Sequence, residues 1–280
     1  MALPYFPVEQ GDFRLSMGLK PLQDDSWIEV DENYTTETAQ RRELLTKQRE
    51  KVFASTPEAK TAEQEVLRRV LAKLKKDHPN IDTAHHLNDP NPLARAAALV
   101  QEDLVIMQEK ENGFALTAAA VCFPSAWDLA SKVGRTMRQI HDPVPRVNTE
   151  IGRSIDLFFN NMKSSKNVQR FNWGLYDSDA LFQPSWWRTQ QAAPEITQET
   201  VGSKIFFRVE KQTLQRLENG RDTLFTIRIF NTPLEEVAID PNKAAQLSKA
   251  IQTMPEDFKG YKSINKYQHL LIPYLEAQAL

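Results

Sequence analysis

The sequence predicts an α+β protein in which helices flank an antiparallel sheet. Helical periodicity dominates the first hundred residues, and two hairpin signals interleaved with helical stretches follow, an order typical of this fold class. The chain has 280 residues, of which 41% are hydrophobic and 26% charged, enough to bury a core. We expect one domain over residues 1–280, with residues 1–95 forming an N-terminal extended arm and helical wrapper.

The N-terminal third predicts an extended arm followed by helices. Residues 1–34 are rich in proline, glycine and aromatic residues, whose large apolar side chains need burial on a body. Apolar stripes predict helices over 36–54 and 62–76. Proline, asparagine and aspartate predict a loop over 78–92, and a short helix is expected over 93–101.

Two Asn-Gly pairs, at 112–113 and 219–220, predict the turns of two β-hairpins. The first pair separates two β-like runs. The second lies between candidate strands over 204–217 and 222–230, and a further strand is expected over 168–177.

Three more helices are expected in the second half of the chain. They cover residues 124–140, 148–162 and 241–252. Asp240 followed by Pro241 is a good N-cap and first-turn pair for the last of them. Residues 177–200 are expected to form a polar, proline-containing excursion.

One of the five histidines, His141, lies at the end of the first of these helices in the stretch QIHDPVP. Pro143 and Pro145 have a fixed φ and no N–H. A residue before proline is disfavoured in the α region, so we expect Asp142 and Val144 to be extended. A histidine held on such a backbone suits a metal ligand or a catalytic base. It also suits an ordinary helix stop, which the residues alone favour.

The strand RVEKQTLQRL is unusually dense in polar side chains. Alternation puts Arg208, Glu210, Gln212 and Arg216 on one face, and Lys211 and Thr213 on the other. A turn at 219–220 would place Lys211 opposite Arg228 and Thr213 opposite Thr226. Two opposed cations are unfavourable unless an anion lies between them. A one-residue slip would instead place Arg228 beside Glu210 or Gln212. A solvated polar face with cross-strand pairs is the favoured alternative.

Charge and motif content exclude several function classes. The net charge of −2 gives no reason to expect nucleic acid or an acidic membrane as partner. No Gly-rich phosphate loop, GxSxG elbow or HExxH motif is present, so we do not expect this chain to bind a dinucleotide.

Cys122 is the only cysteine, which excludes an internal disulfide and an iron–sulfur or zinc-finger site within this chain. Its apolar surroundings predict a small buried side chain. We see no signal peptide and no apolar run near the roughly 20 residues that span a bilayer, so we expect a soluble cytoplasmic protein.

An ordered set of motifs resembles the haem-dependent oxidative N-demethylase α-subunit family over nearly the whole chain. The set is MGLKPL (17–22), ALVQEDLVIM (98–107), AAAVCFPSAWDLASKVGRTMRQIHDPVP (118–145), QRFNWGL (169–175), RVEKQTLQRL (208–217), LFTIR (224–228) and the ending YKSINKYQHLLIPYL. Two positions depart from the family pattern. Lys211 replaces an arginine, so an ammonium with a compact charge stands where a guanidinium could bind an anion through two parallel hydrogen bonds. Glu218 replaces a proline.

The resemblance implies a PAS-like domain that binds haem b. It implies a monooxygenase-type enzyme that uses O₂ to oxidise a small secondary amine, such as dimethylamine, to a primary amine and formaldehyde. Electrons would come from a partner reductase that carries flavin and an iron–sulfur cluster and is fed by NADPH. The lack of dinucleotide motifs and cysteine clusters in this chain agrees with that division of labour.

On this reading His141 supplies a neutral imidazole to the iron. The polar distal wall that handles O₂, protons and the alkylammonium consists of Glu210, Gln212, Thr213 and Arg228. Arg208, Lys211 or Arg216 would meet the haem propionates, and Trp127 and Trp173 would wall the cavity, although burial in the core is the favoured reading of each tryptophan.

Two rival functions remain open. One is a PAS-type haem sensor without catalysis. The lack of a recognisable coiled coil or effector domain after residue 240 counts against it. The other is a non-haem iron site that uses His85, His86 and His141.

Overall fold

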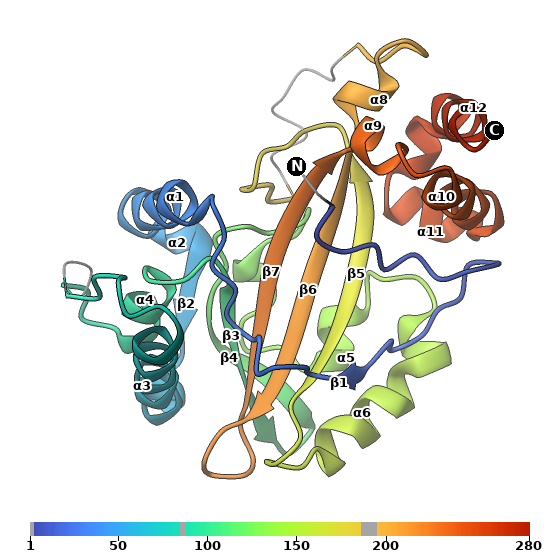
Figure 1. Cartoon of the computed structure of the whole chain (residues 1–280). Coiled ribbons are helices and arrows are strands. Elements are labelled where there is room, and N and C mark those ends of the chain that lie inside the picture. The colour runs from blue at the N-terminus through green and yellow to red at the C-terminus, as the bar shows by residue number, and fades with distance from the viewer. Residues whose placement is uncertain (1–2, 85–87, 186–194) are drawn as a thin grey trace.

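A computed structural model describes residues 3–84, 88–185 and 195–280. Within these ranges one seven-stranded sheet has the order β1-β5-β6-β7-β3-β4-β2, and every neighbouring pair is antiparallel (Figure 1). The strands are β1 (Lys20–Pro21), β2 (Phe53–Ser55), β3 (Asp103–Lys110), β4 (Gly113–Ala120), β5 (Val168–Tyr176), β6 (Phe206–Arg216) and β7 (Thr223–Pro233). The expected antiparallel sheet with flanking helices is confirmed.

Both predicted hairpins are present. β3 and β4 join at the first Asn-Gly pair, and β6 and β7 join at the second. In the second turn Gly220 has a φ of +70°, and the side chain of Asn219 accepts hydrogen bonds from the backbone N–H groups of Arg221 and Asp222. This turn fixes the register of the two longest strands, which places Lys211 opposite Arg228 as expected.

The N-terminal helices pack on the β3–β4 side of the sheet (Figure 1). They are α1 (Tyr34–Lys47), α2 (Arg49–Val52), α3 (Lys60–Asp77) and α4 (Pro92–Ala97). The expected helix over 62–76 is confirmed. The one over 36–54 is broken at Gln48, and its last residues form β2.

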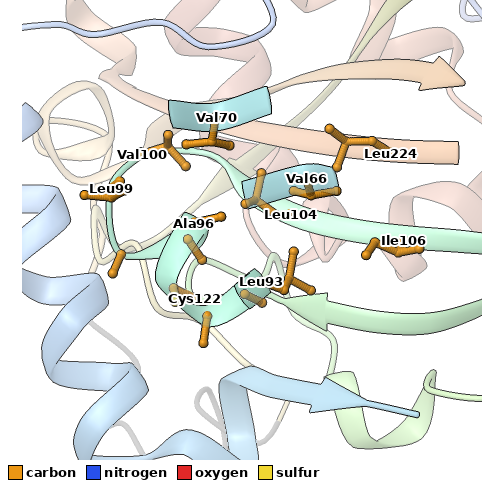
Figure 2. Packing of buried hydrophobic residues seen from close by; sticks show 14 of the residues in the cluster. Val66, Val70, Leu93, Ala96, Leu99, Val100, Leu104, Ile106, Cys122 and Leu224 are labelled. Carbon is orange, nitrogen blue, oxygen red and sulfur yellow. The ribbon is translucent and has the colours of Figure 1, made fainter. Parts of the chain in front are cut away.

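The core beneath these helices is made of branched side chains from helix and sheet. Val66 and Val70 of α3 pack against Leu104 and Ile106 of β3 (Figure 2). Cys122 lies fully buried in the same cluster, so the prediction of a small core side chain is confirmed.

The prediction of a helix over 124–140 is wrong. Only a 3₁₀ turn (Leu129–Ser131) and α5 (Met137–His141) form there. Ala126 and Gly134 have positive φ angles of 61° and 77°, which interrupt a right-handed helix. Thr136 then starts α5 with a capping box, its hydroxyl accepting from the backbone of Gln139.

The expectation that Asp142 is extended is also wrong. Asp142 has φ −50° and ψ −40°, which is helical. The backbone N–H of Val144 donates to the carbonyl of His141 at 2.8 Å, and Asn148 Nδ2 donates to Asp142 Oδ1 at 2.7 Å. These two hydrogen bonds offset the preference that Pro143 imposes on the residue before it. A π-helical turn (Val147–Ile151) and α6 (Gly152–Asn161) follow, so the helix expected over 148–162 is confirmed.

A C-terminal block of short helices packs beside β5 and β6 (Figure 1). It comprises α8 (Val201–Lys204), α9 (Leu234–Val237), α10 (Pro241–Thr253), α11 (Glu256–Tyr261) and α12 (Gln268–Gln278). The side chain of Asp240 accepts from the backbone of Asn242, which confirms the predicted N-cap of α10. Phe207 and Val209 of β6 are buried in the apolar core of this block.

Residues 3–33 form an arm that crosses the sheet to reach α1 (Figure 1). Val8 and Trp27 are 7% and 5% exposed, so the arm is packed on the body. Its β1 segment pairs with Val168 and Gln169 at the start of β5. The arm thereby places acidic residues from the start of the chain over the central strands.

Candidate functional site

Alternation along β6 divides the candidate residues between two faces of the sheet. We call the face that carries Lys211, Thr213, Thr226 and Arg228 the arm face, and the face that carries Arg170, Asn172, Glu210 and Gln212 the opposite face. The four residues expected to form one polar wall are therefore not brought together, since Glu210 and Gln212 lie on one face and Thr213 and Arg228 on the other.

A buried carboxylate is the centre of the opposite face. Glu210 is 8% exposed. Its Oε2 accepts from Gln212 Nε2 at 2.7 Å and from Asn172 Nδ2 at 3.3 Å. Two amides from adjacent strands thus orient this carboxylate.

Lys262 joins this group from the C-terminal block, at the end of α11. Its Nζ donates to the carbonyl of Trp173 at 2.6 Å and to Asn172 Oδ1 at 3.2 Å. The ammonium also lies 5.6 Å from the centre of the Trp173 ring. Burial lowers the pKa of Lys262 to about 8, with Glu210 opposing and Arg170 adding to that shift. Lys262, Asn172, Glu210 and Gln212 form a continuous hydrogen-bonded chain.

Arg170 faces the same carboxylate from β5. It is the cross-strand neighbour of Gln212, and burial lowers its pKa while Glu210 raises it. Its Nε is buried and has no hydrogen-bond partner within the described ranges. A second cation therefore lies beside Glu210 with unused donors.

His141 approaches this region from the end of α5. Its Nδ1 lies 2.9 Å from the carbonyl of Met137, and because a carbonyl only accepts, Nδ1 carries the proton. Burial lowers the pKa of His141, and Arg170 and Lys132 lower it further, whereas the Met137 contact raises it. The neutral ring then presents a lone pair at Nε2.

His85 and His86 lie outside the described residues. Within the described ranges no group of three or more His, Cys, Asp or Glu side chains is arranged to hold a metal ion.

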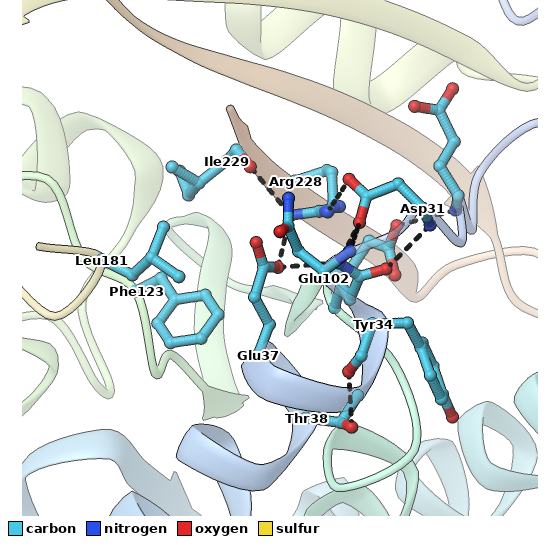
Figure 3. Close-up of polar contacts among 12 residues, drawn as sticks. Asp31, Tyr34, Glu37, Thr38, Glu102, Phe123, Leu181, Arg228 and Ile229 are labelled. Atoms are coloured by element: carbon cyan, nitrogen blue, oxygen red, sulfur yellow. Dashed lines mark hydrogen bonds and ion pairs between the residues drawn. The ribbon is translucent and has the colours of Figure 1, made fainter. Parts of the chain in front are cut away.

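On the arm face the anion expected between the two opposed cations is supplied by the protein itself. Lys211 forms an ion pair with Glu29 and donates to the carbonyl of Ser26 at 2.9 Å. Arg228 bonds Asp31 at 2.6 Å and Glu37 at 2.8 Å (Figure 3). The arm and α1 are therefore tied to the central strands by buried ion pairs.

A second carboxylate, Glu102, lies beneath this network. It is 1% exposed, and its Oε1 accepts from the backbone N–H of Glu29 at 2.9 Å. Its Oε2 is buried without a hydrogen-bond partner among the described residues. Burial raises the pKa of Glu102 to about 7, which Arg228 opposes.

The guanidinium groups of Arg208 and Arg216 donate hydrogen bonds mainly to backbone carbonyls. Arg208, 1% exposed, donates to the carbonyls of Phe123, Ala180 and Leu181 and to Ser125 Oγ. Arg216 donates to Thr223 Oγ1 at 2.9 Å and to the carbonyls of Phe159, Met162 and Arg221. Both guanidinium groups hold chain segments in place.

Trp127 and Trp173 belong to different apolar clusters. Trp127 packs with residues of β4 and α6, whereas Trp173 packs against Phe207, with ring centres 5.8 Å apart. The two rings do not share one wall.

A model of the family described as haem-dependent oxidative N-demethylase, alpha subunit-like, matches residues 18–272. The match covers most of the 280 residues. The chain belongs to this family. The family name indicates a haem-dependent oxidative N-demethylase-like function and an α subunit of a larger assembly. No helix in the described part of the chain is both long and apolar enough to cross a membrane.

The opposite face and the end of α5 together have side chains of the types that a haem requires. His141 presents an unprotonated Nε2, the form of imidazole that binds iron. Arg170 has an orphaned buried Nε, and cations are the usual partners of haem carboxylates. The residues present therefore fit the group that the family name indicates.

Sequence reasoning missed Arg170, Asn172 and Lys262. Arg170 and Asn172 lie two residues apart in the motif QRFNWGL, so alternation alone puts them on one face. Pairing with Glu210 and Gln212 follows only from the β5–β6 register. Nothing in the local pattern around Lys262 signals its contact with β5.

Replacing Arg228 with methionine should destabilise the fold by about 3 kcal/mol, because it leaves Asp31 and Glu37 without their shared cation. Urea denaturation measures the free energy of unfolding. The matched control is Lys47→Met, which removes an exposed pair with Glu43 and should cost at most about 0.5 kcal/mol. Equal effects of the two substitutions would contradict a structural role for the arm-face network.

Glu102 should make stability fall as pH rises. Its pKa is about 7 in the folded protein against an ordinary value of 4.5, so between these pH values the unfolded chain has already lost a proton that the folded protein keeps. The free energy of unfolding should therefore decrease across this window, by on the order of 3 kcal/mol, and stay level above it.

Glu102→Gln should remove this component. Urea denaturation at pH 5 and pH 8 compares the variant with wild type, with exposed Glu111→Gln as control. A pH dependence in Glu102→Gln as steep as in wild type would show that another group is responsible.

Proposed function

We propose that this chain is the haem-binding catalytic subunit of a monooxygenase-type N-demethylase acting on a small, dimethylamine-like secondary amine. One observation carries the proposal. Glu210, a buried carboxylate oriented by two amides, shares a face of the sheet with Arg170, and the charge of Arg170 also acts on the imidazole of His141. The chain that carries this group belongs to a haem-dependent N-demethylase-like family.

In this proposal Glu210 binds the cationic amine. A secondary alkylamine is protonated near neutral pH, and a desolvated carboxylate pairs with an ammonium more strongly than it would in water. Gln212 and Asn172 fix the orientation of the carboxylate. Once the amine is bound, Glu210 can accept its proton and expose the nitrogen lone pair.

His141 is proposed as the iron ligand of haem b within a PAS-like domain. Its Nδ1–H donates to the carbonyl of Met137, which fixes the tautomer and the ring orientation. The haem, when bound, supplies the activation of O₂. Thr213 and Arg228 have a structural role here, because they lie on the arm face.

The proposed reaction consumes one amine, one O₂, two electrons and two protons. One oxygen atom hydroxylates an N-methyl carbon and the other leaves as water. The resulting carbinolamine breaks its C–N bond to give a primary amine and formaldehyde. The electrons come from a partner reductase with flavin and an iron–sulfur cluster that oxidises NADPH, since this chain carries neither dinucleotide motif nor cysteine cluster.

Glu210→Gln tests the amine site. The variant should retain the haem absorption band and lose at least about a hundredfold in amine-dependent kcat/KM, because an amide neither pairs with an ammonium nor accepts its proton. Oxygen uptake and formaldehyde release with an artificial reductant provide the assay. Exposed Glu9→Gln is the control. Unchanged turnover in Glu210→Gln would remove this residue from the site, and haem binding without any turnover in wild type would indicate a sensor.

His141→Ala tests the iron ligand. The variant should show a lower haem content or a changed iron spin state, and added imidazole should partly restore the wild-type spectrum. Exposed His269→Ala is the control and should leave the spectrum unaltered. A wild-type spectrum in His141→Ala would end the assignment, whereas a helix stop alone would cost about 1 kcal/mol of stability.

A further inference from the structure

Cations outnumber acids in the polar group of the opposite face. Glu210 is its carboxylate, and Arg170 and Lys262 both act on it electrostatically. Arg170 and Asn172 are alternate residues of β5, and Asn172 bonds both Lys262 and Glu210. Arg170 and Lys262 are therefore both neighbours of Asn172, and both act on the single carboxylate of Glu210.

Arg170 has donors to spare. A guanidinium carries five N–H groups, and within the described part of the chain the Nε of Arg170 is buried without a hydrogen-bond partner. A buried donor without an acceptor costs free energy, and a buried cation without a bound anion costs more. The unpaired Nε donor of Arg170 therefore suits a ligand with acceptor oxygens.

Lys262 also has capacity for an anion. An ammonium has three N–H groups, of which two bond Trp173 and Asn172. Arg170 and Lys262 carry like charges beside the same residue, Asn172, and Arg170 accordingly lowers the pKa of Lys262, although burial is the main cause of that shift. An anion between them removes that repulsion.

We propose that Arg170 and Lys262 form a carboxylate-binding pair that holds a propionate of the bound haem. The inference rests on the proposed function and assigns a part of the same site. The three cations expected from the sequence to meet the propionates are engaged elsewhere. Lys211 is paired with Glu29 on the arm face, and Arg208 and Arg216 are bonded to backbone carbonyls.

The experiment compares haem with haem dimethyl ester, which lacks the propionate charges. Release to an excess of a haem scavenger is timed in wild type and in Arg170→Gln, Lys262→Gln and the double variant. We expect each single substitution to speed haem release at least about tenfold, as loss of a charge-assisted hydrogen bond does. Esterification should speed release from wild type equally, and should add little in the double variant.

Matched controls separate this result from general loosening of the site. Exposed Arg153→Gln and Lys163→Gln should release haem at the wild-type rate. Arg170→Lys keeps the positive charge and should recover part of the haem retention lost in Arg170→Gln, with near-ultraviolet circular dichroism confirming that each variant is folded.

Three outcomes overturn the inference. Wild-type release that is insensitive to esterification would do so while leaving the proposed function intact. Sensitivity to esterification that survives undiminished in the double variant would place the propionates elsewhere. Free propionate that binds the apoprotein tightly through these residues, without slowing haem loading, would assign the pair to a separate small carboxylate. Failure of wild type to bind haem at all would reject the proposed function itself.

Discussion

The opposition of Lys211 and Arg228 on the two central strands is the constraint on which the rest of the structure depends. The register of β6 and β7 puts these cations directly opposite each other in a buried position. Their charges are compensated by Glu29, Asp31 and Glu37, which lie 182 to 197 residues earlier in the chain. The arm must therefore cross the sheet, and α1 must point Glu37 at Arg228, for the hairpin to be buried at all.

This arrangement on the arm face also determines the chemistry of the opposite face. Successive side chains of β6 point to opposite faces of the sheet. Because Lys211 and Thr213 lie on the arm face, Glu210 and Gln212 lie on the opposite face. The C-terminal block then adds Lys262 and β5 adds Arg170. A structural network and a candidate site thus share one strand, separated by the thickness of the sheet.

Sequence reasoning succeeded where local chemistry decides the structure. The Asn-Gly pairs set both hairpins, and the turn at 219–220 set the register that opposes Lys211 to Arg228. It failed over 124–140, where apolar spacing resembles a helix but positive φ angles at Ala126 and Gly134 divide the segment. It also failed to find Arg170 and Lys262, because their position beside Glu210 depends on strand pairing and on packing between segments some ninety residues apart. Those contacts have no local signature.

The contact between Lys262 and the carbonyl of Trp173 has a consequence for solubility. Within the described ranges β1 pairs with only the first two residues of β5, so most of that strand forms an edge of the sheet. An open edge offers unpaired backbone groups to strands of other molecules, and a lysine placed there is a common protection against such pairing. The Nζ of Lys262 donates a hydrogen bond to the carbonyl of Trp173 on this edge at 2.6 Å, and the ammonium brings a positive charge with it. The same side chain that completes the polar group beside Glu210 therefore also satisfies an edge carbonyl, while the C-terminal block packs beside β5 and limits access to that edge.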